Sequence, residues 1–242
     1  MYSAKKRVTI SLIIPVFNEE GRVHNLDILW TYIKNKKYIR ELIIVNDGST
    51  DKSLSSLKTF QKKSRCILLS YRKNKGKGYA IKKGIRAARG SHAVFMDVDL
   101  STPPKMIGEL KKIIFSSDII VGTRKSKRAV LLHRQSKIRE VMGRLFTYLS
   151  QMIVGVQVSD FTCGFKCFSK KSAKKIFAKQ RINRWAFDAE SLFLAKKYGF
   201  SISELPVQWN DVRGTKVRFP QDIVQSFFDL IQIRINDILE KY

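Results

Sequence analysis

Short apolar runs alternate with longer amphipathic segments over the first half of the chain. We predict strands at 8–15, 42–46, 66–71, 92–96 and 118–122, with helices between them at 19–36, 51–63, 78–89 and 103–115. Strands that alternate with helical segments are typical of βαβ units. The pattern therefore predicts an α/β fold with a mostly parallel central sheet and flanking helices.

Two longer amphipathic helices follow in the second half. Between residues 134 and 156 apolar side chains recur at helical spacing and form one stripe, which includes Leu145, Leu149 and Met152, with Arg139 and Arg144 on the remaining surface. The segment 221–240 repeats the theme. We expect each helix either to pack on the core or to lie on a bilayer surface. No internal repeat or linker is evident, so we expect a single domain over residues 1–242.

The most informative polar residues are Asp97 and Asp99, directly after the apolar run at 92–96. Residues two apart in a strand point to the same face, so both carboxylates are expected to project together from the strand's carboxyl end. Ligands of open α/β sheets bind at that edge. Carboxylate oxygens suit Mg²⁺ or Mn²⁺ carrying a diphosphate. An Asp-x-Asp sequence also occurs in ordinary solvated loops, so its neighbours decide the interpretation.

Polar groups also follow the other predicted strands. Asp47 comes after the second strand, where its carboxylate is placed to accept an N–H of a nucleotide base. The run Asn74-Lys75-Gly76-Lys77-Gly78 opens the third helix, where small residues and a lysine favour phosphate. Pro15 lacks an N–H, so we expect it to end pairing of the first strand and free Phe17 and Glu19 to meet a ligand.

The charge of the chain widens the range of possible ligands. Its 242 residues carry a formal charge of +27, which favours polyanions such as nucleic acid, anionic lipid head groups and phosphorylated substrates. A general bias toward lysine, which produces an ordinary solvated basic surface, is the alternative explanation of this formal charge. A nucleic-acid binder is the alternative from another functional class. Neither basic residues interleaved with exposed aromatics nor a reading helix is evident, so we expect no nucleic-acid partner.

Three features bear on location. Residues 1–7 are polar and basic rather than apolar, and three cysteines, Cys66, Cys163 and Cys167, cannot all be paired with one another, which suits a reducing compartment. The uncharged stretch at 145–159 is too short to cross a bilayer. We therefore expect a cytoplasmic protein that binds peripherally to the cytoplasmic face of a membrane, with the three thiols as packing residues.

In order along the chain, these motifs resemble the nucleotide-diphosphosugar transferase fold called GT-A and, within it, glycosyltransferase family 2. Further motifs resemble the dolichyl-phosphate β-glucosyltransferase group and its prokaryotic polyprenyl-phosphate relatives. They are Asp97-Val98-Asp99-Leu100-Ser101-Thr102-Pro103, Val158-Ser159-Asp160-Phe161-Thr162-Cys163-Gly164-Phe165-Lys166-Cys167-Phe168, Trp185-Ala186-Phe187-Asp188-Ala189-Glu190, and Glu204-Leu205-Pro206-Val207 with Trp209. Members of this group often read D-T-Q-C-G-F-K, whereas this chain has Phe161-Thr162 in place of T-Q, which leaves the sugar open.

The resemblance implies metal-dependent, inverting transfer of a hexose from a nucleotide sugar to a polyisoprenyl phosphate. Glucose from UDP-glucose is the first expectation, and mannose from GDP-mannose or transfer to a soluble glycan are the alternatives. A lipid phosphate is already ionised at neutral pH, so no strong protein base is required. We expect Glu190 to be a structural partner of a basic residue.

The resemblance also implies roles for individual residues. The expected metal ligands are Asp97 and Asp99. The expected donor-binding residues are Pro15, Phe17, Glu19, Asp47, Lys77, Asp97 and Val98. The expected catalytic residues are Asp97, Asp99, Arg124 and Asp188. The expected acceptor-phosphate residues are Arg124, Arg139, Arg144, Arg213 and Lys216.

Overall fold

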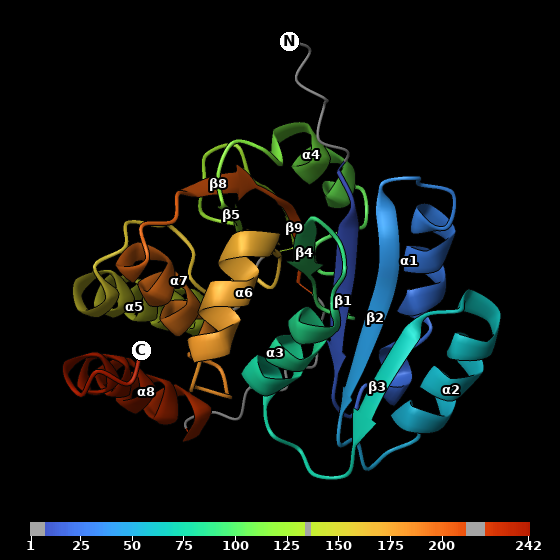
Figure 1. The fold of residues 1–242 in the computed structure, drawn as a ribbon, viewed down its shortest axis with the longest axis horizontal. Coiled ribbons are helices and arrows are strands. Elements are labelled where there is room, and N and C mark those ends of the chain that lie inside the picture. Colours follow the sequence, from blue (N-terminus) through green and yellow to red (C-terminus); the bar gives the residue numbers. More distant parts are fainter. Residues whose placement is uncertain (1–7, 134–136, 212–220) are drawn as a thin grey trace.

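The structure is a computed structural model that describes residues 8–133, 137–211 and 221–242. In this part of the chain seven strands form one sheet in the order β3-β2-β1-β4-β7-β5-β8 (Figure 1). All five predicted strands are present with shifted ends. Neighbouring strands of this sheet pair in parallel, except that β7 lies between β4 and β5 and pairs with both in the antiparallel direction. Their bounds are β1 (Ile10–Val16), β2 (Ile39–Asp47), β3 (Ile67–Tyr71), β4 (His92–Phe95) and β5 (Ile119–Thr123), with β8 (Ile202–Pro206) added beside β5.

One strand runs against the others. β7 (Lys166–Ser169) pairs antiparallel with both β4 and β5, and Lys166 lies opposite Phe95. The segment before Lys166 therefore lies beside the segment after Phe95, at the carboxyl edge of the sheet. This strand is four residues long and starts with a buried lysine, so it carries little of the apolar pattern from which the others were predicted.

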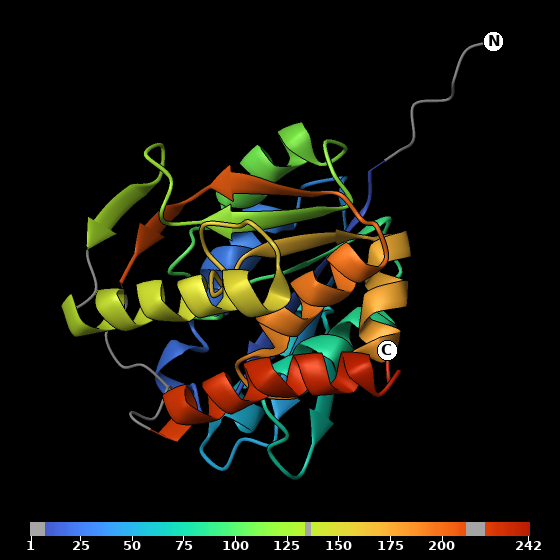
Figure 2. The ribbon, with the colours of Figure 1, turned by 90° about the vertical axis from the view of Figure 1, so that its left-hand side faces the viewer.

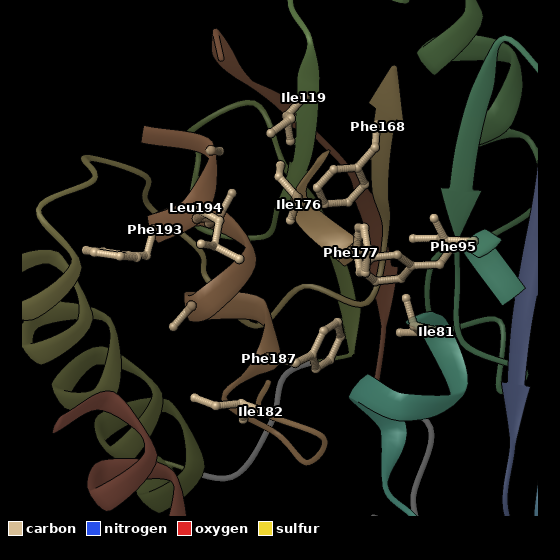
Figure 3. Close-up of a cluster of buried hydrophobic side chains, with 14 of the residues drawn as sticks. Ile81, Phe95, Ile119, Phe168, Ile176, Phe177, Ile182, Phe187, Phe193 and Leu194 are labelled. Atoms are coloured by element: carbon tan, nitrogen blue, oxygen red, sulfur yellow. The ribbon is translucent and has the colours of Figure 1, made fainter. Parts of the chain in front are cut away.

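The sheet separates two apolar clusters. Ile13 of β1 belongs to one, whereas Leu12 and Ile14 belong to the other, because successive side chains of a strand point to opposite faces. On the first face, part of which Figure 3 shows, the core is covered by α3 (Lys77–Ala87), α6 (Lys170–Lys179) and α7 (Phe187–Lys197). The second face is covered by α1 (Asn25–Ile33), α2 (Ser53–Ser64) and α4 (Met106–Ile113).

Two long helices lie side by side beyond α7, as Figure 2 shows: α5 (Lys137–Val154) and α8 (Gln221–Ile238). The rings of Phe146 on α5 and Phe227 on α8 are 6.1 Å apart. A small parallel sheet of β6 (Val130–His133) and β9 (Gln208–Asn210) lies near the first turn of α5. No helix among the described residues has the length and apolar character needed to cross a membrane.

Some predicted boundaries are wrong. A 3-10 turn at Glu20–Arg22 precedes α1, so no continuous helix spans 19–36, and the fourth helix begins at Met106 rather than at the prolines.

Pro15 does not end β1, since Val16 still pairs with Asn46. The amide of Met96 donates to the Ile13 carbonyl, so the backbone polar groups of Ile13 point toward β4. Residues two apart in a strand point their backbone groups to the same side, so the nitrogen of Pro15 also faces β4. Pairing with β4 stops at Ile13, so the missing N–H breaks no ladder bond.

Candidate active site

Asp97 and Asp99 follow β4 at the carboxyl edge of the sheet, beside the first turn of α3. Lys77, the first residue of α3, places its Nζ 2.6 Å from Asp97 Oδ1. The amide of Ser101 donates to Asp99 Oδ1 at 2.9 Å. Burial, reinforced by the negative charge of Asp97, raises the pKa of Asp99. Burial lowers the pKa of Lys77, but Asp97 and the other nearby carboxylates outweigh it, so that pKa is raised. The structure thus places Lys77 and the two aspartates together at this edge of the sheet.

These carboxylates fit a divalent cation. Asp97 Oδ1 pairs with Lys77, and Asp99 Oδ1 accepts the Ser101 amide. Within the described residues no set of three His, Cys, Asp or Glu side chains forms a closed metal site. Mg²⁺ is commonly bound by one or two carboxylates together with phosphate oxygens and water. A cation beside Asp99 also offsets the repulsion from Asp97 that raises its pKa. The donor atoms and the local charge both suit Mg²⁺ or Mn²⁺.

Asp47 ends β2 and is almost completely buried. Its Oδ1 accepts the amide of Lys75 at 2.8 Å, and its Oδ2 accepts the amide of Gly76 at 2.9 Å and the side chain of Asn74 at 2.8 Å. Asp47 therefore anchors the loop that leads into α3. Its predicted contact with a nucleotide base stays a prediction.

The glycines of the same loop pack against protein. Gly76 has φ +101°, and a Cβ there would lie 2.5 Å from the carbonyl oxygen of Asn183. At Gly78 a Cβ would lie 2.6 Å from Phe187 Cβ. The sequence interpretation assigned these small residues to close approach of a phosphate. In the structure the close approach is to Asn183, in the segment before α7, and to Phe187, the first residue of α7.

The loop after β1 is tied to the loop after β2. The amide of Glu19 donates to Ser53 Oγ at 2.8 Å, and its carboxylate pairs with Arg22 at 2.9 Å. Pro15 and Phe17 are partly exposed beside it. The side chain of Val98 lies in the core, so only its backbone faces the edge, and its carbonyl accepts the side chain of Asn25 at 3.1 Å. The donor roles of these residues stay predictions.

Arg124 follows β5 and is held in one direction by Asp160. Its Nε lies 2.6 Å from Asp160 Oδ2 and its Nη2 2.8 Å from Asp160 Oδ1. Burial favours a higher pKa for Asp160, but the Arg124 guanidinium outweighs it and lowers the pKa to about 2. Arg124 also lies over the ring of Trp209, and its side chain is 18% exposed. A fixed, partly exposed guanidinium is suited to binding an anion.

Asp188 lies in the first turn of α7 and pairs with Lys166 at 2.6 Å. Burial raises the pKa of Asp188, although Lys166 and Lys77 oppose the shift. Gly164, two residues before Lys166, lies so close to Asp97 that an added Cβ would overlap Asp97 Oδ2. The structure thus brings together three carboxylates, Asp97, Asp99 and Asp188, which we call the acidic cluster, around Lys77.

Other predicted residues lie elsewhere. Arg144 has a side chain that is 76% exposed, with Glu140 at 3.9 Å as its partner, and no contact among the described residues joins it to the acidic cluster. Lys125, next to Arg124, donates to Thr147 on α5 at 2.6 Å, so α5 passes beside Arg124. The side chain of Arg139 and the residues Arg213 and Lys216 lie outside the described part of the chain.

Glu190 has different partners from those expected. Its carboxylate accepts the backbone amides of Arg181 and Ile182, each at 2.9 Å, and the hydroxyl of Tyr242 at 2.6 Å. Two backbone amides and a tyrosine hydroxyl thus supply the hydrogen bonds, and the basic side chain of Lys82 acts on Glu190 through its charge, which lowers the pKa that burial raises. The three cysteines, Cys66, Cys163 and Cys167, are buried and unpaired, as predicted.

Sequence reasoning gave no role to two buried residues of the site, Asp160 and Lys166. Both stand in the segment 158–168, which was recognised only as a motif. In the sequence, Asp160 and Lys166 each stand as a charged residue inside an otherwise mostly apolar segment, and this pattern was the available sign of a buried ion pair. Such a residue, when buried, requires a partner of opposite charge.

Comparison with known proteins agrees with this geometry. Residues 11–177 match the family model described as "Glycosyl transferase family 2". The chain is 30% identical to dolichyl-phosphate beta-glucosyltransferase of Dictyostelium discoideum, over 96% of this chain and 76% of the relative. It is also 30% identical to the Saccharomyces cerevisiae enzyme of that name, over 98% and 77%.

Solved structures show the same fold. Glucosyl-3-phosphoglycerate synthase from Mycobacterium tuberculosis, in complex with Mn²⁺, UDP and phosphoglyceric acid, has a TM-score of 0.70 at 17% identity, covering 95% of this chain and 78% of that one. The same protein in complex with Mg²⁺ and UDP gives a TM-score of 0.69 at 18% identity, covering 95% and 79%. The expected GT-A fold is confirmed, and the chain is a glycosyltransferase that belongs to glycosyl transferase family 2.

Proposed function

We propose that this enzyme transfers glucose from UDP-glucose to a polyisoprenyl phosphate of the dolichyl type, with inversion at the anomeric carbon and with Mg²⁺ or Mn²⁺. One observation carries the proposal. The acidic cluster and Lys77 meet at the carboxyl edge of a GT-A sheet, in a chain that matches dolichyl-phosphate β-glucosyltransferases over nearly its whole length.

The donor half of the site handles a diphosphate. Asp97 and Asp99 would hold the divalent ion, which when bound offsets negative charge on the leaving nucleotide diphosphate. Lys77 stands at the first turn of α3, beside Asp97, and adds a second positive charge there. Asp47 fixes the loop before α3 and thus the position of Lys77.

The acceptor half orients a lipid phosphate. That phosphate is an ionised nucleophile at neutral pH, so the enzyme's task is to place it in line with the anomeric carbon. Arg124 is held by Asp160, keeps 18% of its side chain exposed and is our proposed phosphate ligand. Asp188 lies close enough to Lys77 to influence its pKa, and we assign it to the sugar hydroxyls or the acceptor.

A panel of donors tests the proposal. UDP- and GDP-sugars are each incubated with a short polyprenyl phosphate and Mg²⁺ or Mn²⁺, and the lipid product is quantified. We expect transfer from UDP-glucose to exceed all other transfers. Preferential use of GDP-mannose, or transfer only to a soluble glycan, would replace the proposed substrate. Tight nucleic-acid binding without any sugar transfer would overturn the proposal as a whole.

We also propose that the enzyme works on the cytoplasmic face of a membrane, through an apolar outer face on α5 and α8. Exposed apolar side chains recur every three or four residues on both helices, so each forms one stripe. They are Val141, Leu145, Tyr148 and Met152 on α5, and Val224, Phe228, Ile231, Ile235 and Ile238 on α8. The opposite side of each helix packs on the core. A chain of +27 is complementary to an anionic leaflet.

Vesicle binding tests the outer face. Phe228→Asp is expected to weaken co-sedimentation with anionic vesicles at low salt, and Phe115→Asp is the matched control, since the two phenylalanines are 62% and 64% exposed and Phe115 lies just after α4. High salt is expected to release the unsubstituted protein. Equal binding of both variants, or no binding by the unsubstituted protein, would contradict this surface.

A further inference from the structure

A lysine to which the proposed mechanism gives no role lies at the centre of the site. Lys166 is the first residue of β7, and its side chain is completely buried. Its Nζ donates to Asp188 Oδ1 at 2.6 Å, to the Cys163 carbonyl at 2.7 Å and to the Phe161 carbonyl at 2.9 Å. An ammonium group has three donors, so every one is used.

The partners of Lys166 belong to two segments that carry groups proposed for transfer. The first is the loop from Asp160 to Gly164. Its first residue holds Arg124, and its last packs against Asp97. Lys166 binds two carbonyls between these points, so it fixes the shape of the loop.

The second segment is the start of α7, which carries Asp188. The Asp188 carboxylate lies among Lys166, Lys77 and Asp97, since each of these charges influences its pKa. Lys77 in turn pairs with Asp97. Lys166 is therefore in direct contact with both segments, although it is too deeply buried to reach a substrate.

Stability alone gives little reason for an ammonium group in this place. Replacing a buried ion pair by well-packed apolar groups is often neutral or stabilising. An ammonium group does differ from an apolar one in imposing a direction on each of its acceptors. We propose that Lys166 is a positioning residue, which sets the 160–164 loop and Asp188 in the arrangement that transfer requires. This inference rests on the proposed function.

The inference predicts a loss in turnover without a loss in nucleotide binding. The loop and Asp188 lie beside Asp97 and Arg124, whereas the predicted base contact is at Asp47, at the end of β2. Lys166→Met is expected to lower kcat about a hundredfold, the scale of a misplacement near 1 Å, and to leave the affinity for UDP measured by calorimetry unchanged. Retained UDP binding also shows that the donor half is folded.

Glu190→Gln provides a control of matched position. Glu190 is buried in the same turn of α7, but its three hydrogen-bond partners belong to Arg181, Ile182 and Tyr242. Removing an acceptor there is expected to lower the melting temperature, as Lys166→Met does, while kcat stays at the unsubstituted level. Turnover of all variants is measured well below the lowest melting temperature of the set.

A second background keeps the test decisive if Lys166→Met alone does not fold. In Asp188→Asn the lysine keeps its two carbonyl partners, and the double variant Lys166→Met/Asp188→Asn leaves no charge at either position of this buried pair. We expect the double variant to turn over about tenfold more slowly than Asp188→Asn, because the loop is no longer held. Equal turnover in this pair, or normal turnover in Lys166→Met, would overturn the inference. Absence of transfer by the unsubstituted enzyme would instead refute the proposed function.

Discussion

The two sides of the sheet's carboxyl edge are built differently. Beside β1 and β2, polar side chains bind neighbouring loops, as Asp47 binds the amides of Lys75 and Gly76. Beside β5 and β7, charges are buried in pairs, Arg124 with Asp160 and Lys166 with Asp188. Removing one partner of a buried pair costs about 3–5 kcal/mol. Substitutions on the first side should therefore change ligand affinity, and those on the second should change stability and turnover together.

The largest effect is expected between the two sides, at the acidic cluster. Asp99→Ala should lower kcat roughly a thousandfold or more, since a lost metal ligand removes several kcal/mol of charge stabilisation. The fold should be unaffected, because burial and Asp97 already disfavour the charged form of Asp99. Steady-state kinetics and thermal unfolding check both parts. Full activity of Asp99→Ala, or of the unsubstituted enzyme in excess chelator, would contradict the metal assignment.

On the side of the buried pairs, Arg124→Met should lower both stability and turnover. The variant leaves Asp160 buried without its partner, at a cost of about 3–5 kcal/mol in unfolding free energy. Arg124→Met/Asp160→Asn removes that charge and should recover most of the stability, while transfer to the lipid phosphate stays about a hundredfold low. Urea unfolding and acceptor kinetics separate the two effects. Normal transfer by the double variant would show that the acceptor phosphate binds elsewhere.

On the loop side, Asp47→Ala should act on donor binding. Loss of the carboxylate frees the loop before α3 and removes the predicted base contact, so the donor KM should rise about ten- to hundredfold with a small change in kcat. Calorimetry with UDP measures the same loss directly. Asn74→Ala, which removes the two hydrogen bonds from the Asn74 side chain to Asp47 and leaves the carboxylate, should have a smaller effect. An unchanged UDP affinity in Asp47→Ala would contradict the assignment.

The smallest effect concerns pH. The pKa of Asp160 is lowered from 3.8 to about 2 in the fold, so its ionised form contributes to stability above the ordinary value, and the contribution is lost as pH falls toward 2. Asp160→Asn should cost about 2 kcal/mol of unfolding free energy at pH 7, which is less than Arg124→Met, because the Arg124 side chain left behind is 18% exposed whereas Asp160 is fully buried. The difference from the unsubstituted protein should shrink as pH falls below 4. Urea titrations at several pH values measure it, and a difference independent of pH would be inconsistent with this pair.

The contrast between the loop side and the side of the buried pairs also explains which parts of the site the sequence predicts. Asp97 and Asp99 follow an apolar run at a spacing of two, and Lys77 stands in a glycine-rich helix start, so each is visible locally. The pairs Arg124–Asp160 and Lys166–Asp188 join residues 36 and 22 positions apart, and depend on β7 running antiparallel. β7 has four residues and begins with a lysine, so its sequence shows no apolar period that would predict a strand inserted between β4 and β5.

The long helices show a second limit. Apolar spacing correctly located α5, but it grouped Leu145, Leu149 and Met152 in one stripe. In the structure Leu145 and Met152 point outward, whereas Leu149 packs against the core. Both sides of the helix carry apolar residues at the same period, so spacing alone does not distinguish a core face from an outer face.

The central claim, that the acidic cluster transfers glucose to a lipid phosphate, is tested most directly by one assay. The unsubstituted enzyme and Asp99→Ala are given UDP-glucose labelled in the sugar, a short polyprenyl phosphate and Mg²⁺, and label in the organic phase is counted. We predict label transfer by the unsubstituted enzyme, abolished by chelator and by Asp99→Ala. Label that stays in the aqueous phase with every acceptor, or transfer undiminished in Asp99→Ala, would contradict the account.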